Sequence, residues 1–187
     1  WETSPACTEL ETHVLDWLVD MMDLPKKFKS NSKGGGVIQD TASSASLVAL
    51  LSAREKASNG ETNENGVNAE FVVYTSSQAH SSIEKAVKIA GIGKNNMRMV
   101  NVDENFAMNS SHLRQLIEED TEKGLKPIFV CATVGTTSST ALDPVDEIGK
   151  ICKEFNIWLH VDAAMAGPAA LCEEYRFIHK GLDFADS

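Results

Sequence analysis

The most informative stretch of this chain is Ile157-Trp158-Leu159-His160-Val161-Asp162-Ala163-Ala164. An apolar run here ends in a carboxylate, which two small residues follow. This pattern is typical of a buried parallel strand that carries one charged group to the carboxyl edge of a sheet. A carboxylate in such a place is costly to bury unless a cation lies against it. The stretch therefore predicts a strand over residues 157–161 and a cationic partner for Asp162.

The rest of the chain alternates between helical and strand patterns. Ser4 and Pro5 are typical of a helix start, and the apolar residues that follow fall on one helical face as far as Pro25. Residues 57–68 are predicted to be a solvated turn region. Further helices are expected over about 41–56, 81–90, 110–124 and from Asp143-Pro144 onward, and further strands over 71–74, 97–102 and 127–134. This alternation predicts an α/β fold, a mostly parallel sheet flanked by helices, in one domain over residues 1–187.

Composition and charge disfavour several classes of function. The net charge of -10 argues against nucleic acid and anionic membranes as partners, and no apolar run is long enough to span a membrane. Cys131 and Cys152 fall within apolar stretches, which predicts buried free thiols in a reducing, cytoplasmic compartment. The histidines lack metal-ligand spacing such as HExxH, so no metal site is expected. The charge run Glu118-Glu119-Asp120 predicts a solvated helix face.

The segment Gly34-Gly35-Gly36-Val37-Ile38-Gln39-Asp40-Thr41-Ala42-Ser43 places a flexible loop and hydroxyls before a helix. Free backbone N–H groups and the helix dipole make it a candidate phosphate site, with Thr41 and Ser43 as side-chain donors. A plain loop with a Ser/Thr helix cap explains the same residues equally well. The segment matches neither GxGxxG nor GxxxxGK[ST], which disfavours a dinucleotide-binding oxidoreductase and a nucleoside triphosphate site.

Two histidines and one turn fall at the predicted carboxyl edge of the sheet. His80 follows the strand at Tyr74, where an imidazole could stack on a flat cofactor, relay a proton, or simply cap a helix. His160 shares a strand face with Asp162, so it either orients that carboxylate or is a satisfied core histidine. Residues 131–140 end a third strand in a turn of glycine and hydroxyl residues, which is either a third polar loop of the site or a turn rich in local hydrogen bonds.

Together these residues resemble the pyridoxal-phosphate decarboxylases of the aromatic amino acid decarboxylase group. The resemblance runs along essentially the whole chain and is carried by an ordered set of motifs: residues 3–11, 34–43, 78–82, 105–108, 135–137, 160–164 and 184–187. It implies part of the large domain of the aminotransferase type I fold, with pyridoxal phosphate as cofactor. An amino acid substrate and a homodimer as the functional form are implied as well.

The resemblance also implies a role for individual residues. Ala42 and Ser43 would hold the cofactor phosphate, and Asp162 would pair with the protonated ring nitrogen, which keeps the cofactor electron-withdrawing. His80 would stack on the pyridine ring and take part in catalysis. The site would be completed by Ala164 on the other ring face, Thr137 and His160.

The match also departs from the family pattern. Family members carry the Schiff-base lysine in an Asn-Pro-His-Lys segment shortly beyond a motif like Ala185-Asp186-Ser187, where this chain ends. We therefore expect a fragment that lacks this lysine, the upstream substrate segment and the C-terminal small domain, and that does not catalyse decarboxylation by itself. Met165 stands where many members have an aromatic residue, which weakens the expectation of an aromatic substrate. The alternatives are an acidic substrate, aldehyde synthesis on the same scaffold, or a non-catalytic truncated product.

Overall fold

The centre of the structure, a computed structural model that describes residues 2–68 and 70–187, is a four-stranded sheet. The strand order is β2-β1-β3-β4, and each neighbouring pair is parallel. The strands are β1 (Phe71–Ser76), β2 (Met97–Val100), β3 (Lys126–Thr133) and β4 (Trp158–Asp162). The predicted α/β fold with a parallel sheet is confirmed, with strand bounds shifted by one or two residues.

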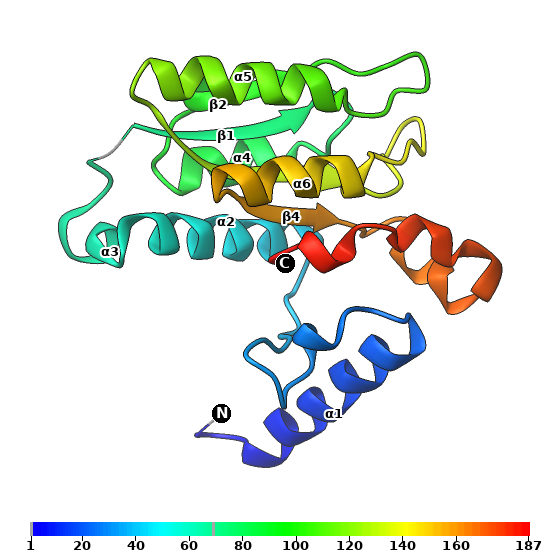
Figure 1. Ribbon diagram of the computed structural model, residues 1–187. Coiled ribbons are helices and arrows are strands. Elements are labelled where there is room, and N and C mark those ends of the chain that lie inside the picture. Colours follow the sequence, from blue (N-terminus) through cyan, green and yellow to red (C-terminus); the bar gives the residue numbers. More distant parts are fainter. Residues whose placement is uncertain (1, 69) are drawn as a thin grey trace.

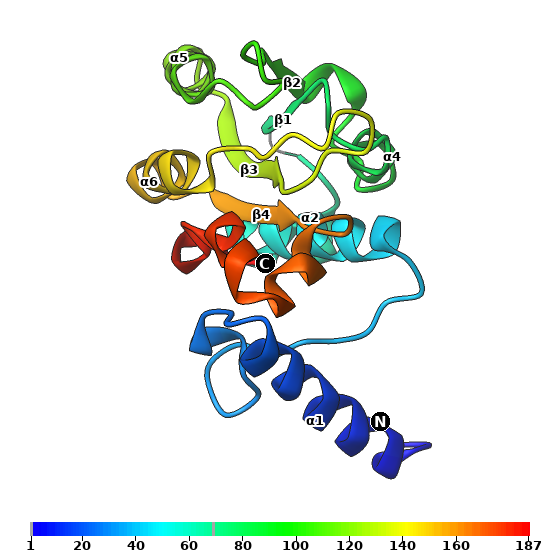
Figure 2. The ribbon, with the colours of Figure 1, turned by 90° about the vertical axis from the view of Figure 1, so that its right-hand side faces the viewer.

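Helices cover both faces of the sheet. Figures 1 and 2 show α2 (Ala42–Ser58) and α4 (Ser82–Ile89) on one face, and α5 (Ser110–Glu122) and α6 (Val145–Phe155) on the other. Because successive side chains of a strand point to opposite faces, each face has its own apolar core. Val73 packs in the core beneath α2 and α4, whereas Val72 packs in the core beneath α5 and α6.

The strand order reverses between β1 and β3. The chain passes from β1 to β2 on one side, and then returns to place β3 on the other side of β1. The loops after β1, β3 and β4 therefore gather at the carboxyl edge. Helix α2 begins at this edge as well, on the side toward which the arrows of β1 and β4 point in Figure 1. Ligands of open α/β sheets bind at such a reversal, so this edge is where a site is expected.

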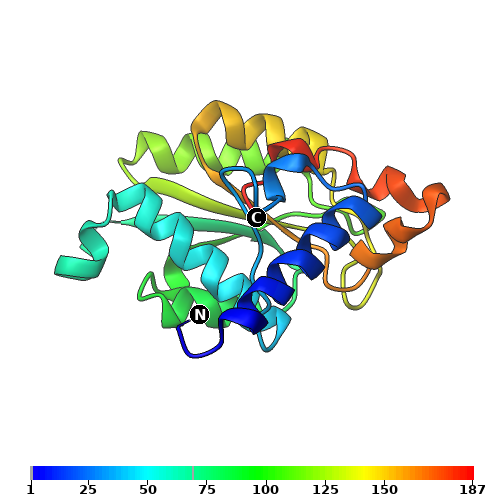
Figure 3. The ribbon, with the colours of Figure 1, turned by 90° about the horizontal axis from the view of Figure 1, so that it is seen from below.

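The N-terminal helix α1 (Pro5–Met21) lies apart from the sheet (Figure 1), and in the view from below it crosses in front of the sheet (Figure 3). It begins at Ser4-Pro5 as predicted, although the Ser4 side chain makes no capping hydrogen bond. Asp23, with φ at 53°, follows its end, so the helix stops before Pro25. Its predicted apolar face is only partly covered: Val14, Leu18 and Met22 are half-buried, whereas Trp17 and Met21 are 59% and 53% exposed.

Two local predictions are wrong. Residues 57–68 contain the short helix α3 (Glu61–Asn65), which begins after Gly60 in the left-handed conformation (φ 85°). Asp143 does not cap α6, which begins at Val145. The Asp143 carboxylate instead accepts the backbone N–H groups of Met108 and Thr133, both at 2.7 Å. These two hydrogen bonds occupy the carboxylate, so it is not available to cap α6.

Short 3-10 helices complete the structure: η1 (Lys26–Phe28), η2 (Lys94–Asn96), η3 (Gly167–Leu171), η4 (Glu173–His179) and η5 (Leu182–Phe184). The backbone then returns along the outer edge of β4, where Asp186 N–H donates to Leu159 O at 2.8 Å and Val161 N–H donates to Ser187 O at 2.9 Å. Among the described residues, no helix has the length and apolar character needed to cross a membrane. Cys131 and Cys152 are buried free thiols as predicted, whereas Cys7 and Cys172 are exposed.

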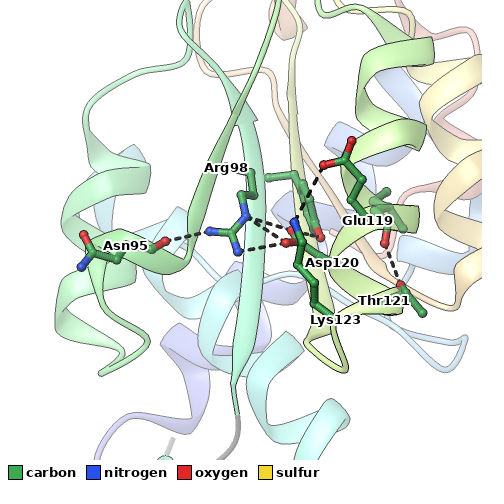
Figure 4. A network of polar contacts seen from close by, with 8 residues as sticks. Asn95, Arg98, Glu119, Asp120, Thr121 and Lys123 are labelled. Atoms are coloured by element: carbon green, nitrogen blue, oxygen red, sulfur yellow. Dashed lines mark hydrogen bonds and ion pairs between the residues drawn. The ribbon is translucent and has the colours of Figure 1, made fainter.

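Asp120 departs from the predicted solvated helix face. Glu118 and Glu122 are exposed as expected, but Asp120 is buried between α5 and the sheet. Arg98 of β2 donates from Nε and Nη2 to both oxygens of the Asp120 carboxylate, at 2.9 to 3.2 Å (Figure 4). The hydroxyl of Tyr74 in β1 donates to the same carboxylate at 2.9 Å. The carboxylate thus joins α5 to two strands.

Candidate functional site

Asp162 is the last residue of β4 and is half-buried at the carboxyl edge. One oxygen of its carboxylate, Oδ1, accepts the backbone N–H of Ala164 at 3.1 Å. Within the described part of the chain, neither a lysine nor an arginine pairs with it. A carboxylate that is partly removed from water and lacks a cation is suited to bind a cationic group of a ligand.

His160 and Asp162 face the side of the sheet that α2 and α4 cover. The ring of His160 stacks on Phe129 with 5.7 Å between the centroids, and Phe129 belongs to the core on that side. Asp162, two residues further along the strand, points to the same side. In the register of β3 and β4, Thr133 lies directly opposite Asp162. The face of the site is therefore the face against which α2 begins.

His160 has the environment of a core histidine. Its burial lowers its pKa to about 4, although the nearby charge of Asp162 opposes this shift, so the ring is neutral at neutral pH. Its Nδ1 lies 3.0 Å from Ser187 Oγ, which also accepts the indole N–H of Trp158 at 2.8 Å. The Ser187 proton remains available for Nδ1. Of the two alternatives, the structure favours a satisfied core histidine over one that holds the Asp162 carboxylate.

His80 lies exposed in the loop between β1 and α4. Its Nδ1 accepts the backbone N–H of Ser82 at 3.2 Å, so this histidine caps α4, whereas the side chain of Ser81 makes no capping bond. Capping does not exclude the predicted role. An acceptor at Nδ1 places the proton of the neutral ring on Nε2, because neutral imidazole has one donor and one acceptor nitrogen.

The start of α2 offers backbone donors at the same edge. Thr41 is the helix cap, because its hydroxyl accepts the backbone N–H of Ser44 at 3.2 Å. The Thr41 hydroxyl, which the sequence predicts as a donor to a phosphate, therefore caps the helix. The N–H groups of Ala42 and Ser43 belong to the first turn and have no acceptor within the helix. Ala42 is exposed and Ser43 half-buried, so both amides are placed for an anion.

A chain of hydrogen bonds ties the loop after β3 to the loop that carries His80. The buried Thr136 contacts Ser139, with 2.7 Å between the hydroxyl oxygens, and its oxygen accepts the Ala141 N–H at 2.8 Å. Ser139 Oγ donates to Gln78 Oε1 at 3.1 Å. Thr137, the predicted site residue, lies exposed beside this chain. Sequence reasoning missed the link between Ser139 and Gln78, because they are 61 residues apart.

Gly135 allows the loop after β3 to approach the segment after β4. It has a positive φ of 84°, and a Cβ atom there would lie 2.5 Å from the Cβ of Ala166. Ala164, in that same segment, is exposed and lines an apolar cleft of about 460 Å³ together with Phe28 and Pro168. Neither Asp162 nor His80 lines this cleft. The predicted contact of Ala164 with the cofactor ring therefore stays a prediction.

A buried hydroxyl, that of Thr133, shows whether the residues at this edge fit a polar ligand. Thr133 Oγ1 is buried, and no hydrogen-bond partner for it exists among the described residues. It lies opposite Asp162, which lacks a cation, and the first turn of α2 has free N–H groups at the same edge. A hydroxyl donor, an anionic group and an anion-binding helix start match a group that carries a protonated ring nitrogen and a phosphate. The residues therefore fit pyridoxal phosphate.

These features define a class: an α/β domain whose residues at the carboxyl edge of a parallel sheet are suited to a phosphorylated, cationic cofactor. The family model of the pyridoxal-dependent decarboxylase conserved domain matches residues 1–187, and the chain belongs to this family. Pyridoxal phosphate is accordingly its cofactor, and the predicted resemblance is confirmed. The match includes residues 1 and 69, which lie outside the described residues.

Known relatives cover the whole chain. Histidine decarboxylase of Mus musculus is 48% identical over 196 residues, and phenylacetaldehyde synthase of Arabidopsis thaliana is 49% identical over 191 residues. The crystal structure of Catharanthus roseus tryptophan decarboxylase in complex with L-tryptophan superposes with a TM-score of 0.91 at 43% identity. The match spans 100% of this chain, but only 29%, 38% and 40% of these three proteins, respectively.

Proposed function

We propose that this chain forms the cofactor-binding part of a longer carboxy-lyase that decarboxylates an L-amino acid, an aromatic one in the first instance. The observation that carries the proposal is Asp162, a half-buried carboxylate without a cation among the described residues, at the edge where α2 begins. Family membership supports the chemistry, and the tryptophan complex of the Catharanthus protein supports an aromatic substrate.

Each residue of the edge then has a defined task. The N–H groups of Ala42 and Ser43 bind the phosphate, and Asp162 holds the proton on the ring nitrogen. When bound, pyridoxal phosphate supplies an electron sink for the electron pair that the departing carboxylate leaves behind. His80 presents an Nε2–H group, which its cap on Ser82 fixes, and Gln78 connects its loop to the loop after β3.

The test is an assay of the full-length protein loaded with pyridoxal phosphate. Release of carbon dioxide and of the matching amine is measured with L-tryptophan, L-tyrosine, L-histidine and L-glutamate. We expect turnover of an aromatic substrate, and an Asp162→Asn variant serves as the impaired control. No carbon dioxide from any of the four, in a protein that binds the cofactor, would overturn the proposed reaction.

Aldehyde synthesis is a second candidate outcome on the same site. It is favoured by the 49% identity to phenylacetaldehyde synthase of Arabidopsis thaliana. In that reaction the amino acid, oxygen and water give aldehyde, carbon dioxide, ammonia and hydrogen peroxide. Oxygen uptake and peroxide release in step with carbon dioxide would establish it, and amine formation without oxygen uptake would exclude it.

Catalysis is proposed for the full-length protein and not for residues 1–187 alone. The reason is that this chain spans only 29% to 40% of the relatives reported above. Purified residues 1–187 are expected to release no carbon dioxide above background. A cytoplasmic location is proposed as well, supported by four free cysteines, and subcellular fractionation tests it.

A homodimer is proposed for the full-length protein on the basis of α1. Exposed apolar residues along this helix, Leu10, Trp17 and Met21, are suited to a protein interface. Trp17→Asp should reduce the sedimentation coefficient to that of a monomer. Ile89→Asp, which alters an exposed apolar residue of α4, is the matched control and should leave the dimer intact. A monomeric wild-type protein would contradict the proposal.

A further inference from the structure

Thr133 is held firmly at the end of β3, yet its hydroxyl has no hydrogen-bond partner among residues 2–68 and 70–187. Its backbone N–H donates to the Asp143 carboxylate at 2.7 Å, and its carbonyl accepts the Asp143 N–H at 3.0 Å. The same carboxylate also binds the backbone of Met108. Both main-chain polar groups of Thr133 are therefore engaged, and the residue is 4% exposed. The unpartnered Oγ1 is not the product of a loose segment.

The hydroxyl lies next to the carboxylate that the cofactor needs. Thr133 and Asp162 are paired in the parallel register, and Val134 N–H donates to Asp162 O at 2.9 Å. Paired side chains on neighbouring strands stand about 5 Å apart on the same face, so one rotamer change can join them. Oδ1 of Asp162 accepts the Ala164 N–H, and a carboxylate can accept several hydrogen bonds. The Asp162 carboxylate can therefore accept a further hydrogen bond from Thr133.

We infer that Thr133 is a positioning residue of the site, whose hydroxyl donates to the Asp162 carboxylate and holds it against the ring nitrogen of the bound cofactor. This inference rests on the proposed function and adds a residue to which the sequence analysis assigns no role. The hydroxyl of Thr75 on the neighbouring strand cannot serve in its place, because it already donates to Cys131 O at 3.4 Å. Thr133 acts through Asp162 and takes no part in proton transfer.

A positioning role and a structural role of the Thr133 hydroxyl differ in their effect on stability. A buried hydroxyl without a partner does not stabilise the fold, so replacing it with a methyl group should be neutral or slightly stabilising in the cofactor-free protein. The same replacement should weaken the loaded protein, because the hydrogen bond to a charged group is then lost. A hydroxyl with a purely structural partner would show the opposite pattern.

The experiment uses full-length protein from which pyridoxal phosphate has been removed. The dissociation constant of added pyridoxal phosphate and the melting temperature without it are measured for wild type, Thr133→Val, Thr133→Ser and Thr75→Val. We expect Thr133→Val to raise the dissociation constant about tenfold without lowering the melting temperature of the cofactor-free protein. Thr133→Ser, which keeps the hydroxyl, should bind within about twofold of wild type.

Thr75→Val is the matched control, because it removes a buried hydroxyl that already has a partner. It should lower the melting temperature by about 2–6 °C and leave the dissociation constant unchanged. Equal binding by Thr133→Val and wild type would overturn the inference while leaving the proposed function intact, as would a stability loss like that of Thr75→Val without weaker binding. A wild-type protein that does not bind the cofactor would overturn the proposed function and the inference with it.

Discussion

Asp120 and Asp162 are the same chemical group in two opposite situations. Asp120 is 2% exposed, and the chain itself provides its complete set of partners, with Arg98 contacting both carboxylate oxygens and Tyr74 donating to one of them. Asp162 is half-buried at the sheet edge, and within the described part of the chain its carboxylate accepts one hydrogen bond, from the Ala164 N–H.

These two environments separate a structural carboxylate from a functional one. A buried charge must be compensated, and where the chain supplies the compensation the charge belongs to the fold. Where the chain supplies only part of it, the remainder comes from a ligand. On this reasoning, changes at Asp120 should act on stability and changes at Asp162 should act on the cofactor.

The largest expected effect is that of Asp162→Asn in the full-length enzyme. The variant keeps the shape of the side chain but removes the negative charge beside the ring nitrogen, so the decarboxylation rate should fall about 10²- to 10³-fold. Its melting temperature without cofactor should stay close to that of wild type, because the Asp162 carboxylate accepts one hydrogen bond from the described residues, which an asparagine side-chain oxygen can accept as well. A rate within tenfold of wild type would contradict the assignment of Asp162.

Asp120→Asn should show the reverse behaviour. Arg98 would remain partly buried without its counter-charge, so the free energy of unfolding should fall by about 3 kcal/mol in urea denaturation. The cofactor dissociation constant of the folded variant should not change. Glu118→Gln in the same helix is the control, and it should alter stability by less than about 0.5 kcal/mol because Glu118 is exposed. Equal effects of both variants would remove the distinction.

The pH dependence of stability tests whether His160 could provide the missing cation. Burial lowers its pKa to about 4 in the folded protein, against about 6.5 in the unfolded chain. The contribution of His160 to stability is therefore fully present above pH 6.5 and is lost as the pH falls from 6.5 towards 4, by roughly 2.5 kcal/mol at pH 4.5.

His160→Gln isolates this contribution from that of the other titrating groups. The loss of stability between pH 6.5 and 4.5 should be smaller in His160→Gln than in wild type, whereas the exposed His13→Gln should follow wild type. Urea denaturation at each pH measures the difference. Parallel profiles for all three proteins would mean that His160 is charged in the folded state and able to compensate Asp162.

The smallest effect is expected for Tyr74→Phe. Burial raises the pKa of Tyr74, so its hydroxyl stays protonated and donates to Asp120. Removing it should cost about 1 kcal/mol of unfolding free energy, because Arg98 still contacts both carboxylate oxygens. A double-mutant cycle with Asp120→Asn should give a coupling energy of similar size, and additive effects would contradict the shared network.

The sequence was sufficient for features that depend on local pattern. Alternating strands and amphipathic helices predicted the parallel sheet, and strand ends placed His80 and Asp162 at one edge. It was insufficient for pairs that only the tertiary structure creates. Asp120 was mistaken for a solvated residue because Arg98 lies on another element, 22 residues away in the sequence.

Thr133 and Asp143 illustrate the same limit. A threonine within an apolar strand carries no local signal that its hydroxyl will be buried without a partner. An aspartate before proline carries a strong signal for a helix cap, yet Asp143 binds Met108 N–H from 35 residues earlier. In both cases the decisive partner, or its absence, follows from the packing of β3 against its surroundings.

The strand order affects how the chain can fold while it is being synthesised on the ribosome. β1 is an interior strand, but both of its neighbours follow it in the chain, and β3 is complete only at Thr133. At ordinary rates of translation, the interval from the end of β1 to the end of β3 lasts roughly 3 to 10 s. Throughout that interval one edge of the apolar strand β1 has no partner from its own sheet. The nascent chain should therefore depend on α2 and α4, which are both synthesised earlier than β3, to shelter β1 from chaperones and from other chains.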